Sequence, residues 1–334
     1  MSEIELKSDV KKEMENNHPS IFKTMTTNEW IEYAKTNPIP RRLFGDLWYE
    51  HEMCILFSDT NLGKSILAVQ IANSLSKGLS TACLVNEVPT QKVLYLDFEL
   101  SSKQFENRYS IDFKEHYIFN PNFLRSELDI EKIRNDNSDF EEQVLNSLET
   151  EVMKHDAKIL IVDNITYLKN ETEKAKDALR LMKILNTIKK KLNISILVLA
   201  HTPKRDSSKS ISKNDVSGSK NLMNFCDSCF AIGESFTESS VRYIKQIKER
   251  NCPKIYDSEN ILIYKIEKIK SFLQFDFIEF GSESDHIIPR TKLEVVERNS
   301  KIIEFNKDGH NNCEIARKVG VSEGTVRNVL EQNR

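Results

Sequence analysis

Apolar runs of strand length alternate with amphipathic stretches of helix length between residues 53 and 200. The runs are apolar throughout rather than at every second position, which is typical of a parallel sheet covered on both faces. In the longer stretches apolar residues recur with helical period, as Leu67, Ile71 and Leu75 do. The expected strands are residues 53–57, 93–98, 117–120, 158–162 and 194–200, and the expected helices are residues 64–76, 101–111, 139–154 and 173–191.

The pattern changes after His201. Residues 202–220 are rich in Ser and Lys, show no periodicity and predict a long loop. Four apolar runs then predict consecutive strands, antiparallel at one edge of the sheet, over residues 226–232, 241–247, 261–269 and 272–280. We therefore expect an N-terminal segment with a short helix (1–40), an α/β domain (41–281), a linker (282–292) and a small domain of three short helices (293–334).

Composition narrows the functional classes. The 334 residues include 48 Lys and Arg against 51 Asp and Glu, so bulk charge does not attract nucleic acid and any such site must be local. No apolar run reaches the roughly 20 residues that span a bilayer, and the charged N-terminus has no signal-peptide core. Six scattered cysteines form no disulfide framework, and the Cys226–Cys229 pair lacks further metal ligands nearby. We expect a cytoplasmic protein without a membrane segment.

A candidate phosphate-binding loop follows the first strand. Residues 58–65 read Ser-Asp-Thr-Asn-Leu-Gly-Lys-Ser and resemble a P-loop, G-x-x-x-x-G-K-[ST], with Ser58 in place of the first glycine. Such a loop directs backbone N–H groups and a helix N-terminus at phosphate, while Lys64 reaches the β- and γ-phosphates and Ser65 holds Mg²⁺. The expected cofactors are therefore ATP and Mg²⁺, and the alternative is a chance Gly-Lys-Ser at a helix start. The expected nucleotide-binding residues are Ser58, Asp59, Thr60, Asn61, Leu62, Gly63, Lys64, Ser65 and Ile66.

Two carboxylates follow later apolar strands. Glu99 comes after the run that begins at residue 93, and Asp163 comes directly after residues 159–162. The carboxyl ends of parallel strands share one crevice, so both side chains are expected beside the P-loop. Glu99 suits the base that activates water, and Asp163 suits a water-mediated partner of Mg²⁺. The alternative is that each carboxylate merely begins a loop.

Together these residues resemble the RecA-like ATPases, most closely the hexameric replicative helicases of the DnaB and plasmid RepA types, over residues 40–280. The resemblance implies a RecA-like P-loop core in which Glu99 is the catalytic glutamate and Asp163 the Walker B aspartate. His201 then stands where the family has a polar sensor that couples the γ-phosphate to the DNA-binding loop. The N-terminal 40 residues are too short for the helicase collar, so we expect a compact ATPase of the kind found on plasmids and mobile elements.

Residues 247–253, Ile-Lys-Glu-Arg-Asn-Cys-Pro, are similar to the helicase motif K-x-R-N-G-P, with Cys252 in place of glycine. The resemblance implies that Lys248 and Arg250 reach the nucleotide of a neighbouring subunit, in a homo-oligomer expected to be a hexameric ring. A cation so far along the chain from the P-loop serves a neighbour's ATP more easily than its own. The alternative is a pair of surface-exposed basic residues on an edge strand.

The long loop is basic. It carries Lys204, Arg205, Lys209 and Lys213, and the resemblance places it in the central channel, where it would grip single-stranded DNA through the backbone. A solvated flexible loop is the alternative.

The C-terminal segment resembles a helix-turn-helix of the resolvase or sigma-region type. Its third helix, residues 323–332, would present Thr325, Arg327 and Asn328 to duplex DNA, although such modules also mediate protein contacts. Its expected core is Ile302, Ile303, Phe305, Ile315, Ala316, Val319, Val321, Val326 and Leu330.

The sequence therefore predicts a Mg²⁺-dependent, DNA-stimulated ATPase, helicase-like, in the replication or mobilisation of a plasmid or mobile element. Two alternatives stay open. One is a DNA-binding regulator whose oligomeric state ATP switches without strand separation. The other is a recombination mediator that shares the ATPase core and differs in its partners.

Overall fold

The computed structural model describes residues 22–81, 83–132, 140–164, 174–202, 205–216, 219–287, 290–321 and 323–332. The chain divides into two units after Pro40. In the first unit, helix α2 (Thr27–Lys35) begins at a capping box, in which Thr26 and Glu29 each bond the other's backbone N–H. None of its residues is buried.

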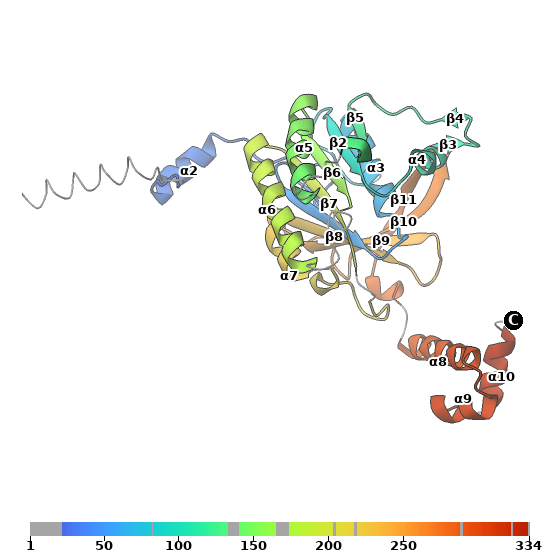
Figure 1. The fold of residues 1–334 in the computed structure, drawn as a ribbon. Coiled ribbons are helices and arrows are strands. Elements are labelled where there is room, and N and C mark those ends of the chain that lie inside the picture. Colours follow the sequence, from blue (N-terminus) through green and yellow to red (C-terminus); the bar gives the residue numbers. More distant parts are fainter. Residues whose placement is uncertain are drawn as a thin grey trace, which may run out of the picture. The chain divides into compact units, whose positions relative to one another are not determined.

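A nine-stranded sheet forms the centre of the second unit, within the described residues (Figure 1). Its strand order is β11-β10-β9-β8-β1-β7-β6-β2-β5. The strands from β8 to β5 in this order run parallel, and β9, β10 and β11 continue the sheet as antiparallel hairpins. Their bounds are β1 (Met53–Ser58), β2 (Val93–Asp97), β5 (Phe123–Glu127), β6 (Ile159–Asp163), β7 (Ser195–His201), β8 (Ser228–Glu234), β9 (Val241–Lys248), β10 (Ile261–Ile269) and β11 (Phe272–Gly281). The mostly parallel sheet with an antiparallel edge is as expected.

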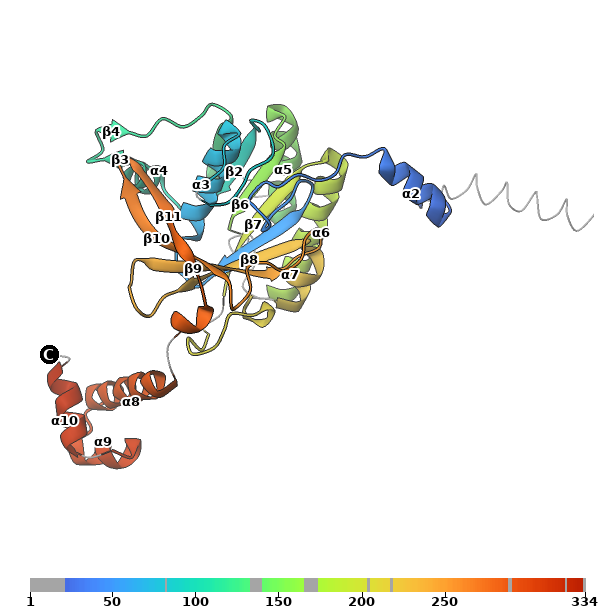
Figure 2. The same ribbon diagram turned by 180° about the vertical axis from the view of Figure 1, so that it is seen from behind.

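Helices cover both faces of the sheet. Because side chains alternate along a strand, Met53, Ile55 and Phe57 of β1 enter one core while Cys54 and Leu56 enter the other. Helices α5 (Phe140–His155), α6 (Lys174–Leu192) and α7 (Ser219–Phe225) pack into the first core (Figure 1). Helix α3 (Lys64–Lys77) packs into the second core (Figure 2). In the described part of the chain, no helix is long and apolar enough to cross a membrane.

The prediction of a strand at residues 117–120 is wrong. The strand that pairs with β2 is β5, and residues 117–120 lie in the connection before it. Tyr117 and Phe119 alternate with other residues as in a strand, but their rings pack into an aromatic cluster with Phe272. Helix α4 (Ser102–Arg108) is capped by Ser101 and ends three residues before the expected end at residue 111. The next residues form a short hairpin of β3 (Ser110–Ile111) and β4 (Glu115–His116).

Part of the expected linker belongs to the sheet unit. Residues Glu283–Asp285 form the 3-10 turn η4, in which Glu283 is 1% exposed. Its carboxylate accepts hydrogen bonds from Lys245 Nζ at 2.6 Å and from the Ile211 backbone N–H at 2.8 Å. Glu283 therefore joins β9, the segment after β7 and the residues that lead toward the C-terminus. Burial alone would raise the pKa of Glu283, but the hydrogen bonds from Lys245, Ser210 and Ile211 outweigh it and lower the pKa.

We expect Glu283→Gln to destabilise the protein by about 3–5 kcal/mol at pH 7, because it leaves the buried Lys245 ammonium without its partner. The lowered pKa of Glu283 means that its contribution is complete above the unfolded-state value, about 4.3, and is lost as the pH falls through the folded-state value. The difference in the free energy of unfolding between the wild-type protein and the variant should therefore shrink in acid. Urea unfolding midpoints at pH 7 and pH 4 measure this. Glu238→Gln, at an exposed pair with Lys265, is the control, and equal midpoints for both variants at pH 7 would contradict the assignment.

The C-terminal segment forms three helices, α8 (Arg290–Lys307), α9 (Asn312–Val319) and α10 (Glu323–Gln332). Three short helices were expected from residue 293 onward, but helix α8 begins at Arg290 and is 18 residues long. All nine expected core residues lie in one apolar cluster, which also includes Val329. Helix α9 ends at Gly320, whose φ of 73° lies in the left-handed region that favours glycine.

Candidate nucleotide-binding site

The candidate phosphate loop connects β1 to α3, so the strand and helix that a P-loop requires are both present. Gly63 begins the helix with a φ of 96°, and a Cβ there would lie 2.8 Å from the side chain of Ile266 on β10. Only glycine fits this position. Of the other expected loop residues, Ser58 and Leu62 are buried, Asp59, Ser65 and Ile66 are half-buried, and Thr60 and Asn61 are exposed.

Lys64 is folded onto the loop and is 6% exposed. Its Nζ donates to the carbonyl oxygens of Ser58 and Asp59, each at 3.0 Å, and to the Ser58 hydroxyl at 3.2 Å. Burial lowers the pKa of Lys64 to about 8, although the nearby carboxylates of Glu99, Asp163 and Asp59 act to raise it. Ser58, where the motif has glycine, is thus part of the loop's own hydrogen bonding.

The structure brings three expected catalytic residues together through hydrogen bonds. His201, at the end of β7, lies with Nδ1 3.1 Å from Lys64 Nζ and Nε2 3.2 Å from Glu99 Oε1. The hydrogen bond from His201 lowers the pKa of Glu99, although burial opposes it. Asn164 lies between them: its amide donates to Glu99 and is 2.8 Å from His201 Nε2. Asn164 was not predicted from the sequence, and its position directly after Asp163 is the signal that could have identified it.

Asp163 ends β6 and is fully buried. Tyr95 donates to its Oδ2 at 2.6 Å, while its Oδ1 is buried without a hydrogen-bond partner among the described residues. Burial raises the pKa of Asp163 to about 6, although hydrogen bonds from Ser65 and Tyr95 oppose the rise. An unpaired carboxylate oxygen beside a serine hydroxyl fits the oxygen ligands that Mg²⁺ takes. Ser65 and Asp163 would hold the ion, which neutralises charge on the phosphates of a bound nucleotide.

Arg108, which was not expected from the sequence, lies near the site. It lies in the last turn of α4, and its charge contributes to the lowered pKa of Glu99. Its Nη1 is buried without a hydrogen-bond partner in the part of the chain that the structure describes. No local pattern in the sequence distinguishes it from other arginines at helix ends.

Lys248 and Arg250 lie at the opposite end of the sheet from the phosphate loop. Lys248 donates to the carbonyl oxygens of Met223 and Cys226 and so holds the end of α7. Arg250 pairs with Asp227 at 3.0 Å, and Asp227 accepts from the backbone N–H of Met53, where β1 begins. Met53 and Ser58 are five residues apart, about 17 Å along the strand, so Arg250 does not reach its own phosphate loop. Its side chain is 54% exposed.

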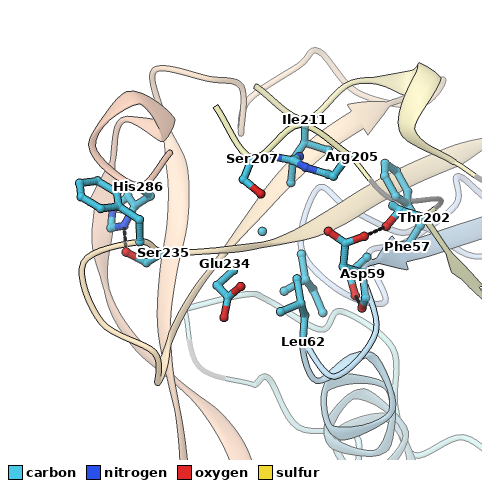
Figure 3. A pocket seen from close by; sticks show the side chains of 14 residues that line it. Phe57, Asp59, Leu62, Thr202, Arg205, Ser207, Ile211, Glu234, Ser235 and His286 are labelled. Carbon is cyan, nitrogen blue, oxygen red and sulfur yellow. Dashed lines mark hydrogen bonds between the residues drawn. The ribbon is translucent and has the colours of Figure 1, made fainter. Parts of the chain in front are cut away.

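The basic segment after β7 borders a pocket beside the phosphate loop (Figure 3). Thr202 donates a hydrogen bond to Asp59 there. Arg205 lines the pocket, and its Nη2 donates to the carbonyl oxygen of Lys209. Lys209 and Lys213 are exposed, while Lys204 lies outside the described residues. On α10, Arg327 is exposed and Thr325 is half-buried, and the side chain of Asn328 lies outside the described part.

A family model described as an AAA domain matches residues 18–207, which is more than half of the chain. The chain belongs to this AAA-domain family. No curated protein matches it. A solved structure of a KaiC-like protein from Pyrococcus horikoshii is similar, with a TM-score of 0.46 and 14% identity over 68% of this chain and 90% of that one.

The strand order and the loop between β1 and α3 give the chain a RecA-like α/β fold, as expected from the sequence. The family and the fold make this AAA-domain protein a P-loop ATPase of the RecA type, built to bind a nucleotide.

Proposed function

We propose that this AAA-domain protein is the Mg²⁺-dependent, DNA-stimulated ATPase of an oligomeric, helicase-like motor that replicates or mobilises a plasmid or mobile element. The observation that carries the proposal is the hydrogen-bonded chain from Lys64 through His201 to Glu99, which joins the phosphate loop to the start of the basic segment.

The hydrolytic step follows from this arrangement. Phosphoryl transfer needs positioning and charge neutralisation more than covalent chemistry. Lys64 leaves its loop carbonyls to contact the β- and γ-phosphates, and Glu99 accepts a proton from the attacking water or orients it. Asn164 and His201 hold the Glu99 carboxylate between them.

His201 supplies the coupling to DNA. It contacts Lys64 and Glu99, and the next residue, Thr202, donates to Asp59 of the phosphate loop. A γ-phosphate that draws Lys64 away changes the contacts of His201 and therefore the segment that begins there. Lys209 and Lys213 on that segment suit the backbone of a single strand.

Oligomerisation completes the proposed site. Arg250 is exposed and distant from its own phosphate loop, so it suits the nucleotide of a neighbouring subunit, whereas Lys248 has a local structural contact as well. Among the three C-terminal helices, the capped α9, the left-handed Gly320 and α10 suit a helix-turn-helix that binds duplex DNA through Arg327.

We expect single-stranded DNA to stimulate ATP hydrolysis, and the stimulation to fall steeply with added salt because phosphate contacts release counterions. The double variant Lys209→Gln/Lys213→Gln should retain basal hydrolysis and lose most of the stimulation. The matched control is Lys183→Gln/Lys190→Gln, two exposed lysines on α6. The measurement is the ATPase rate against DNA concentration at two salt concentrations.

The same assay separates the alternatives. The ATP-switched regulator would be favoured if single-stranded DNA leaves the rate of hydrolysis unchanged and duplex DNA changes it only when residues beyond 290 are present. A mediator would show DNA stimulation without strand separation.

A further inference from the structure

The turn that carries Glu99 is held by a buried aspartate. It joins the end of β2, at Asp97, to the start of α4, at Ser102. Asp97 Oδ1 accepts the backbone N–H groups of Glu99 at 3.1 Å and Leu100 at 2.9 Å. Asn164 and His201 contact the Glu99 carboxylate, and the backbone of this turn sets the point from which that side chain extends to them.

Arg125 closes the turn from the neighbouring strand. It lies on β5, and its Nε donates to Asp97 Oδ2 at 2.9 Å while its Nη2 donates to the Leu100 carbonyl oxygen at 2.8 Å. Its Nη1 donates to Glu127, and the guanidinium lies 4.6 Å from the ring of Phe105 on α4. One planar group thus bonds the aspartate, the turn and its own strand, which the single point charge of lysine could not do.

Asp97 and Asp163 are neighbours on paired strands, yet their oxygens have different partners. The two residues are in register on β2 and β6, and both are buried. Both oxygens of Asp97 are used, by two backbone N–H groups and by Arg125. Asp163 has one oxygen without a hydrogen-bond partner among the residues that the structure describes. Arg125 therefore engages Asp97 in holding the turn, whereas that oxygen of Asp163 suits the proposed Mg²⁺.

We propose that Arg125 and Asp97 are positioning residues that set the place of the Glu99 carboxylate for attack on ATP. The proposal rests on the proposed function, in which Glu99 activates water. Neither residue touches the nucleotide in this role. They act by fixing the turn, and a misplacement of about 1 Å in a catalytic group can cost 10²-fold in rate.

The test compares Arg125→Gln with the wild-type protein. We expect kcat to fall about 10- to 100-fold while the Kd for ATP changes by less than about twofold, because the phosphate loop is untouched. Arg125→Lys keeps a positive charge for Asp97, but lysine cannot bond Asp97 Oδ2 and the Leu100 carbonyl oxygen together as the guanidinium does. This variant should therefore recover only part of the lost rate. Arg42→Gln is the matched control, since Arg42 also bridges two carboxylates, Asp46 and Glu87.

A second comparison separates positioning from general structure. In a Glu99→Gln background, Arg125→Gln should cause no further loss in single-turnover hydrolysis, because it acts through Glu99. An equal loss in both backgrounds, or a weaker Kd for ATP that accounts for the loss, would overturn the proposal. Should Arg125→Gln not fold, Arg125→Lys carries the same comparison. Unchanged hydrolysis in Glu99→Gln itself would overturn the proposed function, whereas a loss there with wild-type kcat in Arg125→Gln would overturn only the positioning role.

Discussion

Glu99→Gln is expected to reduce ATP hydrolysis by about 10²–10⁴-fold while ATP still binds. Glutamine keeps the size of the side chain and can still contact Asn164 and His201, but it cannot accept a proton from water. The phosphate loop and the Asp163 carboxylate are unchanged, so the affinity for nucleotide should remain close to that of the wild-type protein. Steady-state hydrolysis and the binding of a fluorescent ATP analogue, measured on the same preparation, provide the two numbers.

The matched control for this variant is Glu106→Gln. Glu106 lies on α4, the helix that follows the Glu99 turn, and it pairs with Lys103 and His116 away from the phosphate loop. It should keep wild-type kcat. A Glu99→Gln protein that hydrolyses ATP as fast as this control would remove Glu99 from the catalytic role and leave Asn164 and His201 without a base to position.

The sequence predicts the parts of the site that lie within one strand-loop-helix unit. The P-loop could be identified because its constraints are local: an apolar strand, a glycine with positive φ and a lysine at a helix start. The C-terminal core was predicted completely apart from Val329 for the same reason, since its three helices follow one another directly in the sequence.

Residues that support the site or the fold through distant partners, and that no motif marks, could not be predicted. Arg125 bonds Asp97 across 28 positions of the chain, and Glu283 bonds Ile211 across 72. Neither has a local pattern that distinguishes it from other charged residues. The strand expected at residues 117–120 fails for a related reason, because tertiary packing of Tyr117 and Phe119 overrides their strand propensity. The errors therefore lie where long-range contacts decide the structure.

The assignment of Arg250 to a neighbour's nucleotide has the strongest consequence. Arg250→Ala should reduce hydrolysis by about 10³-fold or more, as removal of an arginine finger does. ATP binding should survive, since the phosphate loop is about 17 Å away along β1. Folding should change little, because the Arg250 side chain is exposed and Asp227 keeps its second partner, Lys189, so the lost pair is worth about 1 kcal/mol or less. Lys254→Ala, an exposed lysine in the same connection, is the control.

Mixing two inactive variants decides whether the arginine acts between subunits. Lys64→Ala lacks a working phosphate loop but keeps Arg250, and Arg250→Ala lacks the finger but keeps Lys64. In a head-to-tail assembly, an Arg250→Ala subunit that receives Arg250 from a Lys64→Ala neighbour has a complete site. In an equal mixture, half of the subunits have an intact phosphate loop, and half of these have a neighbour that supplies Arg250. The mixture should therefore regain roughly a quarter of the wild-type rate. If Arg250 served its own nucleotide, no mixture of the two variants would hydrolyse ATP faster than either alone.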